Sequence, residues 1–98
     1  MGILEKIFGN SIHLELILLF YDNPGCFTNI TKLANTLGKS HFTIRNAVSD
    51  LVAADILIEM KIGRSRVIRI NENSPYTTTL FNFISTMRSL KEAIANSK

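Results

Sequence analysis

The chain has 98 residues, 46% of them hydrophobic, which suits one small domain with a single core. Its longest apolar run, residues 16–21, is far too short for a membrane span, and residues 1–8 lack the features of a secretory signal, so we expect a cytoplasmic protein without membrane contact. The formal net charge is +3, and the excess lies in residues 32–69, where seven Lys and Arg oppose three carboxylates, as a polyanionic partner would favour.

Two helices are predicted at the N-terminal end. Residues 1–8 have a short amphipathic pattern, and Ser11 can cap a core helix that residues 23–25, Asn-Pro-Gly, bring to an end. This second helix is apolar nearly all round, which predicts burial on more than one face. Either the N-terminal segment, residues 1–10, or a second subunit can pack against the additional apolar face.

Two further helices follow, with a tight turn between them. After a short strand at residues 26–28, Thr28 or Asn29 can cap a helix that ends at Gly38, which reaches positive φ without Cβ strain. Ser40 caps the next helix, residues 40–53, which is apolar on its inward side and polar on its outward side. This order is typical of a helix-turn-helix.

A β-hairpin is predicted next. The β-rich run at residues 56–62 pairs with the run at residues 66–70 around Gly63. Four polar residues lie at or near the hairpin tip: Lys61, Arg64, Ser65 and Arg66. The three cations among them can contact phosphates or enter a minor groove. The alternative is that they form a charged edge that prevents strand-to-strand aggregation.

The last predicted element is a long helix, with Ser74 as its cap and Pro75 in its first turn. An apolar seam with a spacing near 3.5 residues runs along it and consists of Leu80, Phe83, Ile84, Met87, Leu90 and Ile94. We predict that this seam forms a dimer interface, with packing on its own domain as the alternative. The chain then divides into an N-terminal segment (1–10), a core (11–71) and a C-terminal dimerisation helix (72–98).

No chemistry-bearing constellation is visible. One cysteine, Cys26, and two histidines cannot supply the four ligands of a structural zinc site. There is no Ser-His-Asp set, no paired carboxylates in a polar pocket signature and no Gly-rich phosphate loop. We therefore expect no metal, no cofactor and no enzymatic activity.

Residues 30–38 and 40–51, followed by 54–57, resemble the helix-turn-helix of small prokaryotic winged-helix transcriptional regulators, and residues 63–71 resemble their wing. The resemblance covers most of the chain, with departures at Phe42 and Asp55. It implies a mainly α fold with a small β-hairpin (α+β), namely a winged helix-turn-helix with an extended C-terminal dimerisation helix.

An exposed helix fits the DNA major groove, where Arg45 can contact guanine and Asn46 adenine. The other residues assigned to DNA on this helix and its turn are Lys39, Ser40, His41, Phe42, Thr43 and Ser49. A solvated polar face is the alternative.

These patterns favour a homodimeric, sequence-specific regulator that binds double-stranded DNA, with residues 40–53 in the major groove and residues 61–67 on the backbone or in the minor groove. The alternative is a winged-helix protein-interaction module without DNA binding. The sequence predicts no particular small-molecule effector.

Overall fold

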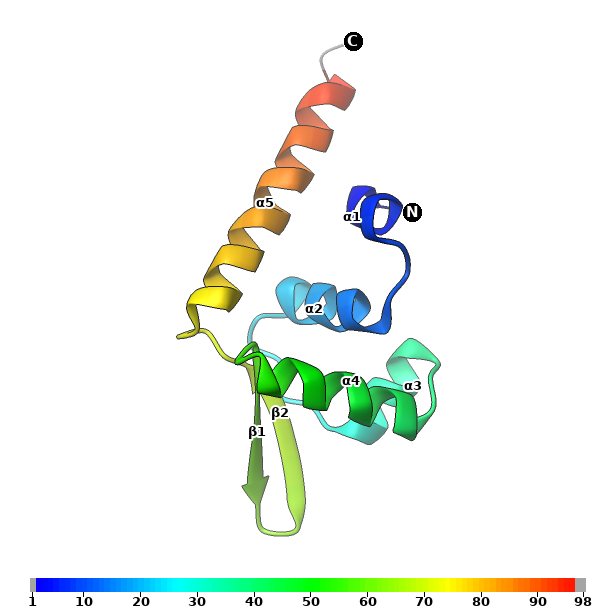
Figure 1. Cartoon of the computed structure of the whole chain (residues 1–98), viewed down its shortest axis with the longest axis vertical. Helices are drawn as coiled ribbons and strands as arrows, with labels where there is room; N and C mark the ends of the chain where they lie inside the picture. Colours follow the sequence, from blue (N-terminus) through cyan, green and yellow to red (C-terminus); the bar gives the residue numbers. More distant parts are fainter. Residues whose placement is uncertain (1, 97–98) are drawn as a thin grey trace.

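The computed structural model describes residues 2–96 and shows a helical body with a hairpin and a long helix projecting from it (Figure 1). Met1, expected to begin the first helix, and residues 97–98 of the C-terminal segment lie outside the described residues. The elements in order are α1 (Ile3–Phe8), α2 (Ile12–Asp22), α3 (Ile30–Leu37), α4 (His41–Ala53), β1 (Leu57–Ile62), β2 (Ser65–Ile70) and α5 (Pro75–Asn96). This is the predicted winged helix-turn-helix with a long C-terminal helix.

The predicted helix signals act locally as expected. The side chain of Ser11 accepts a hydrogen bond from the backbone N–H of Leu14 at 3.0 Å, and Ser40 accepts one from Thr43 at 3.1 Å. Of the two candidate caps for α3, Asn29 is the one used. Gly38 ends α3 with φ of 65°, in the left-handed region where a Cβ would be strained.

The strand predicted at residues 26–28 is reduced to a single bridge. Only Thr28 pairs, exchanging two backbone hydrogen bonds of 3.0 and 2.8 Å with Ile68. The prediction of a three-residue strand was therefore wrong in extent, because the bridge between Thr28 and Ile68 does not continue to a neighbouring pair of residues. The bridge nevertheless ties the start of α3 to the hairpin.

The hairpin consists of β1 and β2, which pair antiparallel from Leu57 with Ile70 to Ile62 with Ser65. Gly63 and Arg64 form its two-residue turn, and Gly63 has φ of 61°. Because side chains alternate between the two faces of a strand, this register assigns Glu59, Lys61 and Arg66 to the same face. The same face carries Leu57, Ile68 and Ile70, which are buried in the core at the end of the hairpin away from the turn.

The core lies where α2, α3, α4 and the base of the hairpin meet, and α2 crosses its centre. Leu16 and Phe20 of α2 are fully buried, and Ile17 packs against the core from the side. On its other side α2 lies beside α1 and α5, so the near-continuous apolar character of this helix is explained by burial within the chain. No helix among residues 2–96 is long and apolar enough to span a membrane.

A cluster of side chains, here called the α2–α5 junction, joins the end of α2 to the middle of α5. The hydroxyl oxygens of Tyr21 and Ser85 lie 2.6 Å apart, and the Tyr21 ring meets the Phe81 ring edge-on at 5.1 Å. Arg88 donates to Asp22 at 2.6 Å and lies 5.2 Å from the centre of the Tyr21 ring. The hydrogen bond to Asp22 raises the pKa of Arg88 above its ordinary value. The junction ties the middle of α5 to the end of α2 through two polar contacts and one ring contact.

Candidate nucleic-acid interface

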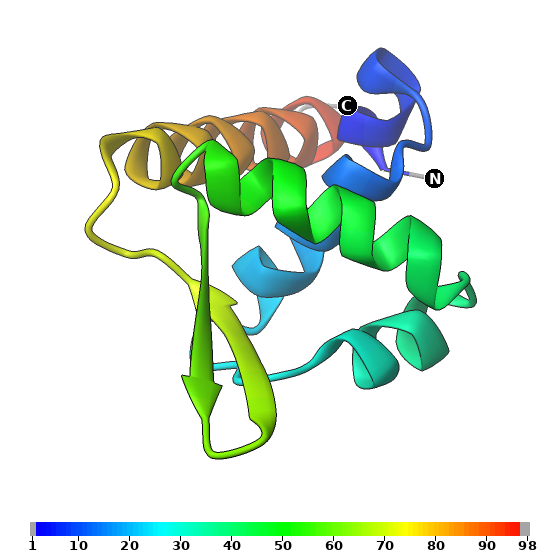
Figure 2. The same ribbon diagram turned by 60° about the horizontal axis from the view of Figure 1, so that its bottom comes forward.

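The helix predicted to contact DNA, α4, lies across one face of the molecule, with α3 on one side and the hairpin on another (Figure 2). Its core side is made by Ile44, Ala47, Val48 and Leu51. Successive residues turn about 100° around a helix, so Phe42, Asn46 and Ser49 form the stripe most nearly opposite the core. All three are exposed, and 72% of Phe42 is accessible to solvent. Arg45, also exposed, lies on the flank that faces the hairpin.

The N-terminal turn of α4 is closed by its own side chains. Ser40 donates to the hydroxyl of Thr43 at 2.9 Å while its oxygen caps the helix. The ring of His41 lies 3.3 Å from the hydroxyl of Thr31 on α3. Ser40, His41 and Thr43 therefore have partners within the helix-turn-helix, whereas Lys39 in the turn is exposed with no side-chain partner among residues 2–96.

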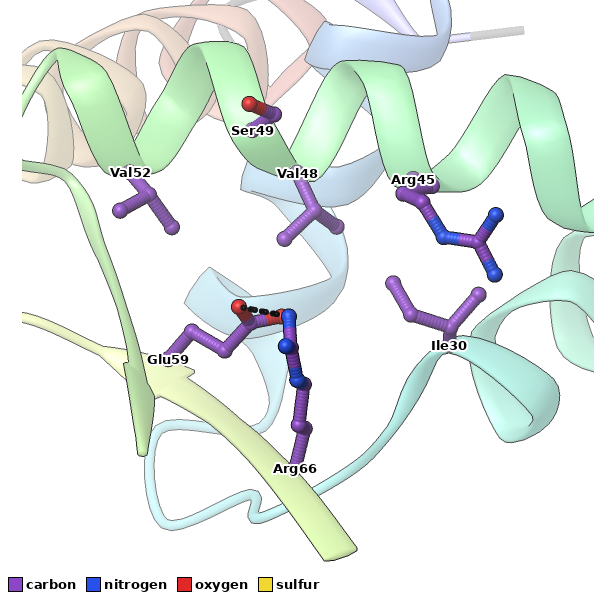
Figure 3. Close-up of a pocket in the computed structure, with 7 residues that line it drawn as sticks. All are labelled: Ile30, Arg45, Val48, Ser49, Val52, Glu59 and Arg66. Carbon is purple, nitrogen blue, oxygen red and sulfur yellow. Dashed lines mark hydrogen bonds and ion pairs between the residues drawn. The ribbon is translucent and has the colours of Figure 1, made fainter. Parts of the chain in front are cut away.

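A groove separates α4 from the hairpin (Figure 3). It has a volume of about 570 Å³, and its lining residues are Ile30, Arg45, Val48, Ser49, Val52, Glu59 and Arg66. Arg66, predicted at or near the hairpin tip, extends its side chain into this groove, where its Nη1 lies 3.5 Å from Oε1 of Glu59 (Figure 3). Glu59 was not among the residues predicted for the site. Pairing around the Gly63–Arg64 turn was the signal that could have found it, because that register places Glu59 diagonally across from Arg66.

The other predicted hairpin residues lie at the exposed end. Lys61 and Arg64 are exposed, and within the described part of the chain neither side chain has a hydrogen bond or an ion pair. Ser65 is exposed at the start of β2 and lines a second groove on the outer side together with Phe27. Phe27, 64% accessible, is a further exposed aromatic residue that the sequence pattern did not single out.

The predicted dimer seam divides into three groups. Ile84 is 2% accessible and packs inside its own chain, and Leu80 and Met87 are half-buried. The exposed members are Phe83, Leu90 and Ile94, at 40%, 53% and 67%. The Phe83 ring also meets the Phe8 ring of α1 edge-on at 6.1 Å. Within residues 2–96, no group of three or more His, Cys, Asp and Glu side chains could hold a metal ion.

No protein-family model and no curated protein matches the chain. Solved structures with a similar fold do exist. AF1382 from Archaeoglobus fulgidus has a TM-score of 0.68 at 17% identity, over 90% of this chain and 96% of that one. RV1404 from Mycobacterium tuberculosis also has a TM-score of 0.68 at 17% identity, over 96% of this chain and 65% of that one. The adhesin competence repressor (AdcR) from Streptococcus pyogenes has a TM-score of 0.58 at 18% identity, over 97% and 74% of the two chains.

At these identities the comparisons show the fold. The chain is a winged-helix protein, with α3 and α4 as the helix-turn-helix and the β1–β2 hairpin as the wing.

Proposed function

We propose that the protein is a homodimeric transcriptional regulator that binds double-stranded DNA in a sequence-specific manner, with α4 in the major groove and the wing on the backbone or in the minor groove. The observation that carries the proposal is the exposed outer side of α4, which presents Arg45, Asn46 and Ser49 next to a cationic wing. Neither surface is needed to close the core. The similarity in fold to a protein named as a repressor agrees with it.

The exposed outer side of α4 offers the groups that read base edges. Asn46 can make a bidentate contact to adenine, Arg45 can do the same to guanine, and Phe42 can touch a thymine methyl group. Lys39, Lys61 and Arg64 are exposed cations at the two ends of this face and suit contacts to phosphates. Base reading is thus assigned to α4, and most of the sequence-independent affinity to the turn and wing.

The dimer is assigned to α5 and α1. Phe83 and Leu90 are exposed on α5, and Ile7 and Phe8 of the neighbouring α1 are 52% and 57% accessible, so the apolar surface continues from one helix to the other. A twofold dimer predicts a pseudo-palindromic site whose half-sites are separated by about one helical turn, roughly 34 Å, or a multiple of it.

The deciding experiment is a fluorescence anisotropy titration of random duplex DNA and of the protein's own promoter region at two salt concentrations. We expect binding that is tighter on the promoter and that weakens steeply with salt, with a slope of about 0.9 for each neutralised phosphate. Asn46→Ala should reduce the difference between the affinities for promoter and random DNA. Arg64→Ala should lower both affinities by a similar factor. No binding to either duplex at low salt would overturn the proposal.

The dimer has a separate test. Phe83→Asp combined with Leu90→Asp places charges on exposed positions, so the core stays intact while self-association is lost. Sedimentation should show a monomer that binds DNA more weakly, and Ser89→Asp, an exposed position on the same helix, is the control. An unchanged sedimentation mass in the double variant would remove α5 from the interface.

The exposed apolar surface on α1 and α5 also favours a second candidate, a protein-interaction module without DNA binding. An apolar contact of this kind would depend only weakly on salt. In the DNA titration the two candidates differ at low salt, because the interaction module would bind neither duplex, and salt-sensitive binding to duplex DNA favours the regulator.

A further inference from the structure

The wing carries an unfavourable pair of charges on the face that looks toward α4. Lys61 and Arg66 lie directly opposite each other in the β1–β2 register, and like charges in that position repel. Glu59, diagonal to Arg66 on the same face, is the carboxylate that offsets this repulsion. Its contact with Arg66 is 3.5 Å long, beyond the roughly 2.7–2.9 Å of a strong charge-assisted hydrogen bond.

The ion pair between Glu59 and Arg66 is easy to separate. The Arg66 side chain is 68% accessible and the Glu59 side chain 30%, so water can replace either partner. Exposed pairs of this kind contribute little to stability. Arg66 can therefore exchange Glu59 for a stronger acceptor without disturbing the wing.

The groove around this pair favours an anion. Arg45 projects from the opposite wall, on α4, and within the described residues its side chain has no hydrogen-bond or ion-pair partner (Figure 3). Glu59 is the one carboxylate in the lining. The remaining wall is largely apolar, with Val48 and Val52 on the α4 side, and this lowers the competition from water for a bound anion.

The position of the groove indicates that the anion would be a phosphate of the DNA backbone. In duplex DNA a sugar-phosphate strand separates the major groove from the minor groove. If α4 occupies the major groove and the wing lies over the adjacent backbone or minor groove, that strand must pass between them. The space between α4 and the wing is the groove that holds Glu59 and Arg66.

We infer that this groove receives one backbone phosphate of the bound duplex and that Glu59 competes with that phosphate for Arg66. The inference rests on the proposed DNA-binding function and deepens it. In the free protein Glu59 holds Arg66 in the groove, and on binding Arg66 exchanges the carboxylate for the phosphate. Because every duplex has phosphates, Glu59 weakens binding to all sequences and leaves the preference for one sequence unchanged.

The test is Glu59→Gln, which removes the charge and keeps the shape of the side chain. Affinity for promoter and random duplexes should rise by the same factor, about two- to fivefold at low salt, the range that one exposed charge pair supports. The dependence of log affinity on log salt should become steeper by up to about 0.9, the value for one more neutralised phosphate. Glu92→Gln on α5 removes the same charge far from α4 and should change both quantities little.

A comparison with a double variant distinguishes competition between Glu59 and the phosphate for Arg66 from simple repulsion between Glu59 and the DNA. In an Arg66→Ala background, Glu59→Gln should tighten binding much less than it does in the wild type, because there is no arginine left to release. Equal tightening with and without Arg66 would overturn the competition.

The remaining outcomes are also decisive. A wild-type protein that binds no DNA at low salt overturns the proposed function, and the inference falls with it. A wild type that binds DNA while Glu59→Gln is unchanged, weaker, or tighter on the promoter alone overturns the inference and leaves the function standing.

Discussion

The wing and the C-terminal helix project from the core in opposite directions, and they are anchored by the same means (Figure 1). The base of the wing is held by Leu57, Ile68 and Ile70, each at most 2% accessible. The first half of α5 is held by Thr77 and Ile84, both at 2%. In each case burial of a few side chains at one end leaves the other end free to contact a partner.

The free ends differ in chemistry. The end of the wing carries Lys61 and Arg64, while the outer half of α5 exposes Leu90. A cationic end suits a polyanion, and an apolar end suits a second protein surface. The comparison teaches that packing decides where a projection starts, and that the residues left outside the core decide what it can bind.

The largest expected effect is at the base of the wing. Ile68→Ala should destabilise the protein by about 2–5 kcal/mol, because Ile68 is fully buried and the cavity adds to the lost burial energy. Urea unfolding followed by circular dichroism measures it. Ile62→Ala on the same hairpin, where the side chain is 59% accessible, should change stability by less than about 0.5 kcal/mol. Similar losses at both positions would show that the wing is not anchored through its base.

The matching substitution on α5, Ile84→Ala, should lower the free energy of unfolding by a smaller amount, near the lower end of about 2–5 kcal/mol. Ile84 lies at the edge of the body between α1, α2 and α5, where the surroundings can collapse more easily than around Ile68. The same unfolding experiment compares the two. A loss of stability larger than that of Ile68→Ala would reverse the ranking of these two anchoring positions.

An intermediate effect is expected at Asp55, at the start of the wing, where φ is 67° in a residue that has a Cβ. Asn71 donates to its carbonyl oxygen at 3.1 Å and to its Oδ1 at 3.0 Å, which holds this conformation. Asp55→Ala keeps the strain and loses the side-chain bond, whereas Asp55→Gly relieves the strain. The Gly variant should therefore be more stable than the Ala variant by about 1–2 kcal/mol in thermal or urea unfolding. Equal stabilities would contradict strain at this position.

The smallest effect is expected at the α2–α5 junction. Tyr21→Phe removes the hydroxyl bonded to Ser85 but keeps the contact with Phe81, so a loss of about 0.5–1 kcal/mol is expected. Faster amide hydrogen exchange should accompany it in the middle of α5. Tyr76→Phe is the control, since its ring is 65% accessible and its hydroxyl has no partner among residues 2–96. Unchanged exchange in Tyr21→Phe would mean that the ring contact with Phe81 and the ion pair between Arg88 and Asp22 hold α5 without the Tyr21 hydroxyl.

Much of the candidate site was predictable, because the ends of its helices and the exposed side of α4 depend on local interactions. A serine or asparagine before a helix satisfies a free N–H within three residues, and Gly38 accepts a backbone that other residues resist. The predicted exposure of Phe42, Asn46 and Ser49 follows from the apolar spacing of α4. None of this needs knowledge of the rest of the chain.

The partners of the charged side chains were not predictable in the same way. Arg66 was predicted at or near the hairpin tip, and the register of the two strands brings its side chain to Glu59. Similarly, the spacing of the α5 seam treats Phe83 and Ile84 alike, although Ile84 is buried and Phe83 is 40% accessible. A repeat in the sequence gives the width of an apolar stripe but not the rotation of the helix, which depends on packing against α1 and α2.

The amino-acid sequence by itself thus determined the helices, the hairpin, their caps and turns, and the polar outer face of α4, because hydrogen bonding and periodicity act over a few residues. Only the tertiary structure decided which side of α5 is covered, the conformation of Asp55 and the groove in which Glu59 faces Arg66. Those features depend on how elements distant in the sequence pack, and packing is a property of the whole chain.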